Sequence, residues 1–355
     1  MIPEQIKNLV KSGHAAPSAD NTQPWLFVWD GEALYIRYDA KRVQGTTFPP
    51  ESQATFLAVG GVIENISQAA SFADIALDIN IPDTISTDLS EPYVKISFLD
   101  TQESNTDIHQ HPLFQRHTNR FKYRKTPLPS DIKHTLTTMT EGNAHIKIFE
   151  QKTSIKKIAS VALAASKVRF QTQEVHEWLA KSLRFTDHSV KKADGLDVRT
   201  LDLPPGGRQF LHFISDWNRI QPLNKLGIYN LLALIDSRPL RQAPAIVSII
   251  SSTDPRSSLN AGRLLARAWT HLNSLGIAVH PYYVVSDQLN RLNKNLVPEK
   301  LTGQVENLKY QCENLFNLEA GEALHMLLRI GYPTRTPPRS LRLPFERVFT
   351  DLTND

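Results

Sequence analysis

Two long stretches of the chain repeat apolar side chains at intervals of three and four residues. Residues 50–72 follow Pro49-Pro50, and their apolar face consists of Phe56, Val59, Ile63, Ile66 and Ala70. Residues 259–275 are bounded by a possible cap at Ser258 and by Gly276, and their apolar face consists of Leu264, Leu265, Ala268, Leu272 and Leu275. This spacing predicts two long helices, each of which must bury one face.

Shorter segments are rich in β-branched and aromatic residues, and several of them alternate apolar and polar positions. They predict strands over 25–29, 34–38, 93–99, 145–149, 245–252 and 324–330. Asp30-Gly31 separates the first two strands, which is a strong signal for a hairpin turn. The remaining helical patterns predict helices over 4–16, from Pro127–Ser130 to about Thr140, and over 153–182.

The predicted elements occur in a similar order in the two halves of the chain. Each half runs helix, strand, long apolar helix and strand, which suggests a diverged duplication. The polar segment 100–115 is the predicted linker, so we divide the chain into residues 1–105 and 106–355. Within the second part, residues 186–222 have little periodicity, and a stretch of this kind in a compact enzyme is often a lid or a binding loop. We therefore place a possible lid within residues 186–240.

Composition and charge narrow the class of protein. The chain has 355 residues, 41% hydrophobic and 21% charged, which is typical of a globular protein. A single cysteine, Cys312, excludes an intrachain disulfide framework and a cysteine-based zinc cluster. No apolar run has the roughly 18 residues needed to span a bilayer, and the N-terminus lacks the pattern of a signal peptide. We expect a cytoplasmic protein with no membrane partner.

The segment from Ala16 to Trp25 is the first candidate for chemistry. It reads Ala-Pro-Ser-Ala-Asp-Asn-Thr-Gln-Pro-Trp, a stiff turn with two prolines and a row of short polar side chains. Such side chains suit the ring nitrogens and carbonyls of a flat heterocycle. The alternative is an ordinary turn between a helix and a strand, which composition alone favours.

The segment Arg116-His-Thr-Asn-Arg120 is the second candidate. In an extended backbone, Arg116, Thr118 and Arg120 point to the same side, and guanidinium groups bind phosphate oxygens in a bidentate way. A solvated basic stretch explains the pattern equally well. Five basic residues between 116 and 125, with Phe121 and Tyr123 among them, also fit a nucleic-acid groove. The net charge of only +4 and the lack of a known nucleic-acid motif argue against such a partner.

The end of the chain is the third candidate. Leu328-Arg-Ile-Gly-Tyr-Pro333 is followed by a proline-rich tail that contains Arg339, Ser340 and Arg342. These arginines could reach a phosphate group, although in isolation the tail is best explained as a basic terminus. His109, His111 and His117 lack the spacing of a metal site, so we expect no metal.

Taken in this order, the three motifs resemble the nitroreductase family of flavin oxidoreductases. They are most similar to the subgroup in which two nitroreductase repeats are fused in one chain, the Acg-type FMN-binding proteins. The resemblance implies an α+β fold of two repeats that form an intrachain pseudo-dimer, with mostly antiparallel sheets flanked by helices. It also implies FMN at the interface between the repeats and a monomeric chain, because the dimer is fused.

The resemblance assigns roles to individual residues. Arg116, Thr118, Arg120 and Arg342 would hold the FMN phosphate, with Ser340 beside them. Pro17, Ser18 and Asn21 would contact the flavin ring, and His280 would lie near its reactive N5. No side chain is required as a catalyst, because the flavin carries the chemistry.

Each half of the chain lacks the motif that the other half contains, so one complete site is expected, with one FMN per chain. The implied activity passes a hydride from NADH or NADPH through FMN to a small electron-poor acceptor, such as a nitroaromatic, a quinone or a biosynthetic intermediate. The alternative is a protein that binds and sequesters FMN under a lid without turnover.

Overall fold

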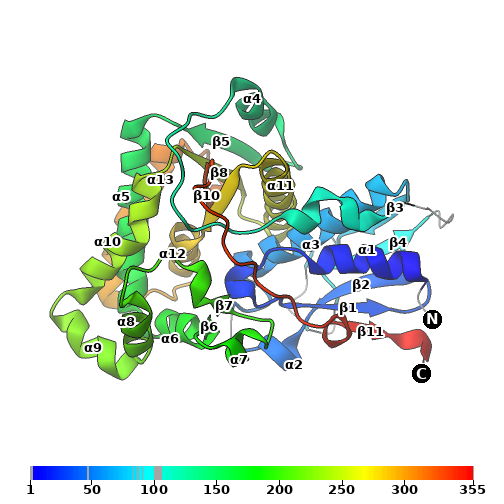
Figure 1. The fold of residues 1–355 in the computed structure, drawn as a ribbon, viewed down its shortest axis with the longest axis horizontal. Coiled ribbons are helices and arrows are strands. Elements are labelled where there is room, and N and C mark those ends of the chain that lie inside the picture. Colours follow the sequence, from blue (N-terminus) through cyan, green and yellow to red (C-terminus); the bar gives the residue numbers. More distant parts are fainter. Residues whose placement is uncertain are drawn as a thin grey trace.

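The computed structural model contains two sheets with helices packed against them (Figure 1). It describes residues 3–45, 48–82, 84–85, 88–89, 91–99 and 106–354. The class is α+β, and the sheets are mostly antiparallel and flanked by helices, as the sequence analysis predicted. Two 20-residue helices, α3 (Gln53–Phe72) and α11 (Pro255–Ser274), pack against each other where the two sheet-bearing parts meet.

The first sheet is built mainly from the N-terminal part of the chain. Its strand order is β11-β1-β2-β4-β3, and the strands are β1 (Trp25–Trp29), β2 (Ala33–Tyr38), β3 (Leu77–Asn80), β4 (Val94–Phe98) and β11 (Phe349–Asp351). All pairs are antiparallel except β1 with β11, where Phe27 lies opposite Phe349. The C-terminal tail therefore crosses back to complete the sheet of the N-terminal part (Figure 1).

The second sheet has the strand order β5-β8-β10-β9, and every pair is antiparallel. Its strands are β5 (His145–Phe149), β8 (Ala245–Ser252), β9 (Ala278–Tyr282) and β10 (Glu322–Gly331). Counted from β1 and from β5, both sheets have the order first, second, fourth, third. In both, the long helix connects the second strand with the third.

Helices α3 and α11 approach closely through one glycine on each. A Cβ atom on Gly60 would collide with the carbonyl oxygen of Leu259, and a Cβ atom on Gly262 would collide with that of Leu57. Each glycine thus lies against the residue three positions before the other glycine. Only the absence of a side chain permits backbones to come this near, so the two glycines fix how the two parts of the chain join.

Four charged residues beside this crossing form a compensated network. Arg267 donates from Nε to Glu64 at 2.6 Å and from Nη2 to Glu141 at 2.6 Å, while Arg263 pairs with the same two carboxylates. Hydrogen bonds to Glu64 and Glu141 raise the pKa of Arg267. Because Glu64 is on α3 and both arginines are on α11, the network joins the two parts of the chain.

The remaining helices agree with the predicted ones where predictions existed. Helices α1 (Glu4–His14) and α4 (Ser130–Thr138) precede the first and the second sheet, respectively. The exception is the predicted helix over 153–182, which is divided into α5 (Lys152–Gln171) and α6 (Gln173–Ser182). The structure adds elements that the patterns did not predict, namely α2 (Ala40–Val43), α12 (Val284–Asn293), α13 (Glu299–Phe316), and the strands β3, β9 and β11.

The weakly patterned stretch after residue 182 contains short elements rather than one long loop. They are β6 (Leu183–Arg184), α7 (Asp187–Val190), β7 (Leu196–Asp197), α8 (Gly207–Ile214), α9 (Trp217–Lys225) and α10 (Ile228–Arg241). Together with α5 and α6 they form an insertion between the first two strands of the second sheet. Helices α8–α10 occupy an outer corner of the molecule (Figure 1).

One predicted boundary is wrong. Helix α11 begins at Pro255, not after Ser258, and its cap is Asp254, whose carboxylate accepts from the N–H of Ser257 at 2.8 Å. Aspartate followed by proline at the first helical position is a regular start signal. Ser258 instead lies buried inside the helix. Of the predicted linker, residues 100–105 lie outside the described residues, and 106–115 contain two short 3-10 turns.

In the described ranges, every helix is too short or too polar to pass through a bilayer.

Candidate functional site

The predicted ring-binding turn has a constrained backbone. Asp20, Asn21 and Gln23 have φ values of 49°, 56° and 53°, a region that costs energy for residues other than glycine. Ser18 Oγ accepts from the N–H of Gln23 at 2.9 Å, and Pro17 packs against α3 at Gly61. The turn is therefore fixed by its own hydrogen bonds and by the helix below it.

The predicted phosphate segment runs alongside the second sheet. Thr118 bridges Val279 of β9 in parallel, and Asn119 N–H donates to the carbonyl of Val279 at 2.9 Å. The N–H of His117 donates to Asn273 Oδ1 at 2.8 Å, and Trp269 Nε1 donates to the carbonyl of His117 at 3.1 Å. The segment is thus extended, as the sequence analysis assumed, and α11 and β9 hold it in place.

Three arginines from distant parts of the chain meet beside the turn, and we name Arg116, Arg339 and Arg342 the arginine cluster. Nη2 of Arg116 and Nη2 of Arg342 both donate to the carbonyl of Ala15, at 2.8 and 3.4 Å. Arg339 Nη2 donates to the carbonyl of Arg116 at 3.1 Å. Arg342 also donates to Asn21 Oδ1 at 2.6 Å, so the cluster adjoins the predicted ring-binding turn.

The charge of the arginine cluster is not compensated. Among the described residues, no carboxylate forms an ion pair with any of its members. Burial and the positive charges of Arg342 and Arg339 lower the pKa of Arg116, and burial beside Arg339 lowers that of Arg342 to about 10. The Nε atoms of Arg116 and Arg342 are buried and have no hydrogen-bond partner. Guanidinium groups without a carboxylate partner and with an unpartnered buried Nε are suited to bind an anion, and the donor set is of the kind that binds phosphate.

Arg120 and His280 belong to a neighbouring group rather than to the arginine cluster. Arg120 Nη1 lies 3.4 Å from Thr200 Oγ1. Burial lowers the pKa of Arg120, and the negative charge of Asp20 partly offsets this shift. Burial, Arg329 and Arg120 hold the pKa of His280 well below its usual value, so this imidazole is neutral. Its Nδ1 is buried without a hydrogen-bond partner.

Sequence reasoning assigned no role to two polar side chains at the site, Asn119 and Arg329. Asn119 orders the phosphate segment by donating to the carbonyl of Arg335 at 2.9 Å and accepting from the N–H of Phe121 at 3.0 Å. Arg329 lies opposite His280 in the sheet, 3.9 Å from the Tyr123 ring centre. Arg339, which the sequence analysis expected to be able to reach a phosphate, and Ser340, which was predicted as a ligand, are both exposed. Their roles depend on contacts between distant segments, for which the sequence contains no signal.

The insertion reaches the turn through a short loop, residues 193–202, which we name the lid loop. Gln23 Nε2 donates to the carbonyl of Ala193 at 3.0 Å, and the N–H of Gly195 donates to the carbonyl of Asn21 at 3.3 Å. Gln23 Oε1 accepts from the N–H of Leu343 at 2.9 Å. Because its amide binds the lid loop and the C-terminal tail, Gln23 joins both to the turn.

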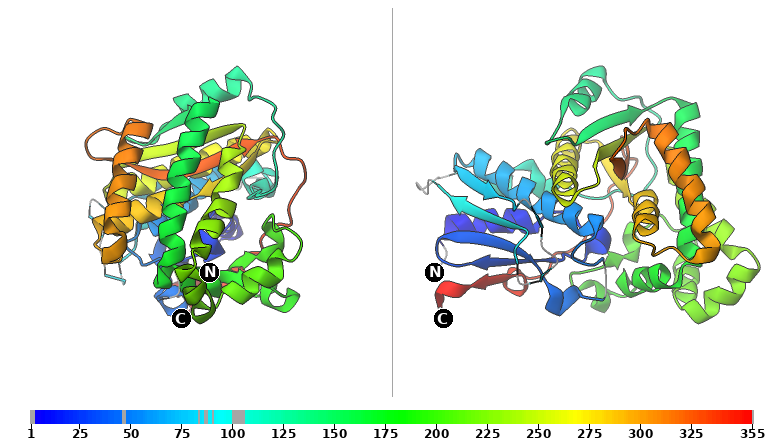
Figure 2. Two further views of the ribbon diagram at one scale, coloured as in Figure 1. Left: turned by 90° about the vertical axis from the view of Figure 1, so that its left-hand side faces the viewer. Right: turned by 180° about the vertical axis from the view of Figure 1, so that it is seen from behind.

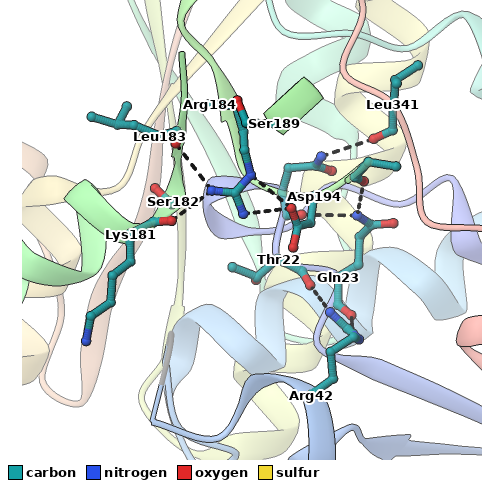
Figure 3. A network of polar contacts seen from close by, with 12 residues as sticks. Thr22, Gln23, Arg42, Lys181, Ser182, Leu183, Arg184, Ser189, Asp194 and Leu341 are labelled. Carbon is teal, nitrogen blue, oxygen red and sulfur yellow. Dashed lines mark hydrogen bonds and ion pairs between the residues drawn. The ribbon is translucent and has the colours of Figure 1, made fainter. Parts of the chain in front are cut away.

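The lid loop is braced from the other side by Arg184. Its guanidinium binds Asp194 at 2.7 Å and packs against Gly195 (Figure 3). Arg184 also donates to the carbonyl of Lys181 at 2.8 Å, which anchors the lid loop to the end of α6. The lid loop is thus held to the turn by backbone carbonyls and to the insertion by an ion pair.

His14 connects the C-terminal tail to the same turn, and it makes stability depend on pH. One ring nitrogen lies 2.9 Å from the carbonyl of Leu343 and the other accepts from Trp25 Nε1 at 3.1 Å, which requires a neutral ring. Burial lowers the pKa of His14 from 6.5 to about 4. Because the unfolded state takes up the proton first, the stability that His14 contributes is present above pH 6.5 and is lost as the pH falls towards 4.

We expect the His14→Gln variant to lose less stability on acidification, since glutamine can donate to Leu343 without taking up a proton. Between pH 7 and pH 5, the wild-type free energy of unfolding should fall by about 2 kcal/mol more than that of the variant. Urea unfolding at the two pH values measures this difference. Equal losses in the two proteins would contradict a neutral, buried His14.

The described residues contain no group of three or more His, Cys, Asp or Glu side chains arranged to hold a metal ion. Cys312 is buried among apolar residues of α5, α13 and the second sheet, where burial raises the pKa of its thiol to about 12. Neither feature adds to the chemistry of the site.

Comparison with known proteins gives limited similarity. No family model matches the chain. An uncharacterized protein of Mycobacterium tuberculosis (strain CDC 1551 / Oshkosh) is 24% identical over 276 residues, which cover 75% of this chain. The chain spans only 37% of the length of that curated relative.

Two solved structures align with about two thirds of the chain. The FMN-dependent nitroreductase NfnB of Mycobacterium smegmatis, in complex with NADPH, aligns with a TM-score of 0.38 and 14% identity, over 67% of this chain and 95% of that chain. A nitroreductase of Bacteroides fragilis with bound FMN aligns with a TM-score of 0.36 and 9% identity, over 64% of this chain and 90% of that chain. At such low identities and TM-scores, any statement about ligand or activity must come from the residues of this chain itself.

Proposed function

We propose that the chain is an FMN-dependent oxidoreductase of the nitroreductase type. The observation that carries the proposal is the arginine cluster, three guanidinium groups without carboxylate partners among the described residues, next to a polar turn with a fixed backbone. Within the cluster Arg116 is buried, Arg342 is half-buried and Arg339 is exposed. A mononucleotide has the two parts that this arrangement suits, a phosphate dianion and a flat polar ring. The three sequence motifs that resemble nitroreductases are the ones that meet here.

Arg116, Arg339 and Arg342 would bind the phosphate, and Thr118 would add the hydroxyl of the same segment. Ser340 remains a weaker candidate because, unlike the equally exposed Arg339, it forms no hydrogen bond with the arginine cluster in the described part of the chain. Pro17, Ser18 and Asn21 would face the ring system. Arg120, beside the neutral His280, would place positive charge near the ring rather than on the phosphate. This assignment of Arg120 differs from the one implied by the motif.

When bound, FMN would accept a hydride from NADH or NADPH and pass it to a small electron-poor acceptor such as a nitroaromatic or a quinone. The chain's residues would position the cofactor, exclude water and supply charge. The neutral imidazole of His280 could hydrogen-bond a ligand but would not carry a proton at physiological pH, since its pKa lies well below the usual value.

The chain would contain two diverged copies of one repeat and a single FMN site. Equal strand order in the two sheets and the reciprocal contacts of Gly60 and Gly262 support the duplication. Aligning these glycines places Ser67 and Ser71 of α3 where α11 has Trp269 and Asn273, the residues that hold the phosphate segment. The hollow beside Ser67 and Ser71 is lined by Arg263 and Arg267, which Glu64 and Glu141 neutralise. The second position therefore lacks an uncompensated cation that could hold a phosphate. Because both repeats are in one chain, the protein would function as a monomer.

The proposal is tested by loading the full chain with FMN and quantifying the flavin released on denaturation. We expect one FMN per chain, together with the absorption bands of a bound flavin and oxidation of NADH or NADPH in the presence of menadione. A colourless protein that binds no FMN would contradict the proposal, and two FMN per chain would contradict the single site.

FMN sequestration without turnover is the second candidate, and the lid loop favours it. The loop binds the carbonyl of Asn21 and the amide of Gln23, so it lies against the turn that would contact the ring. A loop held there can restrict access of a reductant or an acceptor.

We expect Arg184→Ala to loosen the lid loop, because Asp194 loses its partner, without altering the turn or the arginine cluster. If the loop limits access, the rates of FMN dissociation and of flavin reduction by NADPH should rise by about tenfold, the usual value of one charged hydrogen bond. Stopped-flow absorbance measures both, and Lys309→Ala on the distant helix α13 is the control. Unchanged rates would show that the lid loop does not control access.

A further inference from the structure

The outer face of helix α10 combines exposed apolar and basic side chains. Leu231, Leu234 and Ile235 are 48%, 50% and 49% exposed, and Arg238 and Arg241 continue the same face one turn further on. The opposite face of α10 is buried: Leu232 packs with Ile214 and Ile220, and Leu240 packs against α5. Helix α10 is therefore apolar on both sides of its N-terminal half, and only one side is covered.

The neighbouring elements carry further exposed apolar side chains. Leu226, in the turn between α9 and α10, is 85% exposed, and Phe213 on α8 is 46% exposed with the Arg219 guanidinium over its ring. Six of the exposed large apolar side chains of the described residues lie between positions 210 and 235. We name this surface, on α8–α10, the insertion face. It lies at an outer corner, and α10 is on the side turned toward the viewer in the left panel of Figure 2.

The charge of the insertion face identifies the kind of partner. Residues 207–242 contain five arginines and lysines but only two aspartates, so this segment carries a net charge of +3 in a chain whose net charge is +4. Asp236 is engaged with Arg169 and Ser166, and Asp216 caps α9 and pairs with Arg219. Arg208, Lys225, Arg238 and Arg241 are exposed and have no acidic partner among the described residues.

We propose that the insertion face docks on an anionic lipid surface. Apolar side chains on a protruding helix face can enter the headgroup region without a shaped pocket, and flanking basic residues bind anionic headgroups. A second copy of the chain fits less well, since pairing two insertion faces would bring like charges together. Docking of this kind needs no spanning helix, so it is compatible with the absence of one among the described residues. It would revise the expectation, from the sequence, of no membrane partner.

Co-sedimentation of the full chain with vesicles tests the proposal. We expect binding to phosphatidylcholine vesicles that contain phosphatidylglycerol, little binding to phosphatidylcholine alone, and weaker binding as salt is raised. We expect Arg238→Glu/Arg241→Glu to weaken binding at least tenfold, because each basic residue near an anionic surface contributes about a fivefold effect. We expect a loss of similar size from Leu231→Ser/Leu234→Ser/Ile235→Ser, because the strength of binding also depends on the apolar area that enters the headgroup region. Lys41→Glu/Arg347→Glu, on the part of the chain that carries the first sheet, is the control with the same charge change.

Unfolding midpoints measured by circular dichroism confirm that the variants are folded. Four results would overturn the proposal. They are no binding to anionic vesicles, equal loss of binding in the control, concentration-dependent dimerisation that Leu231→Ser/Leu234→Ser/Ile235→Ser abolishes, and capture of an acidic protein by a chain with no affinity for vesicles. None of these outcomes depends on FMN binding, so the experiment tests lipid docking separately from the proposed function.

Discussion

Arg116→Leu is expected to weaken FMN binding by about 100-fold, the effect of losing one or two charge-assisted hydrogen bonds to a phosphate. Arg116 is buried over the Trp269 ring at 4.8 Å and lies beside two other guanidinium groups that have no carboxylate partner. Leucine fills part of the same space against Trp269. Titration of the full chain with FMN, followed by flavin fluorescence, measures the change in dissociation constant.

The same substitution should not lower the stability of the FMN-free protein. Removing the buried Arg116 charge relieves its repulsion with Arg342 and Arg339, which offsets the loss of the hydrogen bond to the carbonyl of Ala15. A purely structural arginine would give the opposite result, with lower stability and unchanged affinity for FMN. Arg347→Leu, which changes an exposed arginine of the same tail, should leave both quantities unchanged.

Gly60→Ala is expected to lower the free energy of unfolding by about 3 kcal/mol or more, at the upper end of overpacking effects. The added Cβ would collide with the carbonyl oxygen of Leu259 and lie 3.0 Å from the Cα of Gly262, and a backbone cannot move aside as a flexible side chain can. Helices α3 and α11 must therefore separate. Since α3 supports the ring-binding turn and α11 supports the phosphate segment, the affinity for FMN should fall as well.

Gly303→Ala provides the matched control for this prediction. Gly303 lies in helix α13 with open space around the position of a Cβ atom, so alanine should raise stability by about 1 kcal/mol through helix propensity. Urea denaturation of the two variants compares them directly. A Gly60→Ala protein as stable as the wild type would show that the two helices are not in contact at this position.

The sequence predicted much of the fold because strong periodic patterns are local. The apolar repeats of α3 and α11 and the β-rich segments around β1, β2 and β8 each contain their own signal. The short strands β3 and β11 do not, because their pairing depends on strands far away in the chain. The start of α11 was missed although Asp254-Pro255 contains the signal, since the apolar pattern begins only later.

By itself, the sequence determined the α+β class and the three motifs from which a flavin site could be inferred. Only the tertiary structure decided which of their residues act together, because the contacts join segments hundreds of residues apart. It grouped Arg116 with Arg342 and Arg339, placed Arg120 beside Asp20 and Thr200, and brought the lid loop onto Gln23. Whether a charge is compensated depends on what surrounds it after folding, and no spacing along the chain contains that information.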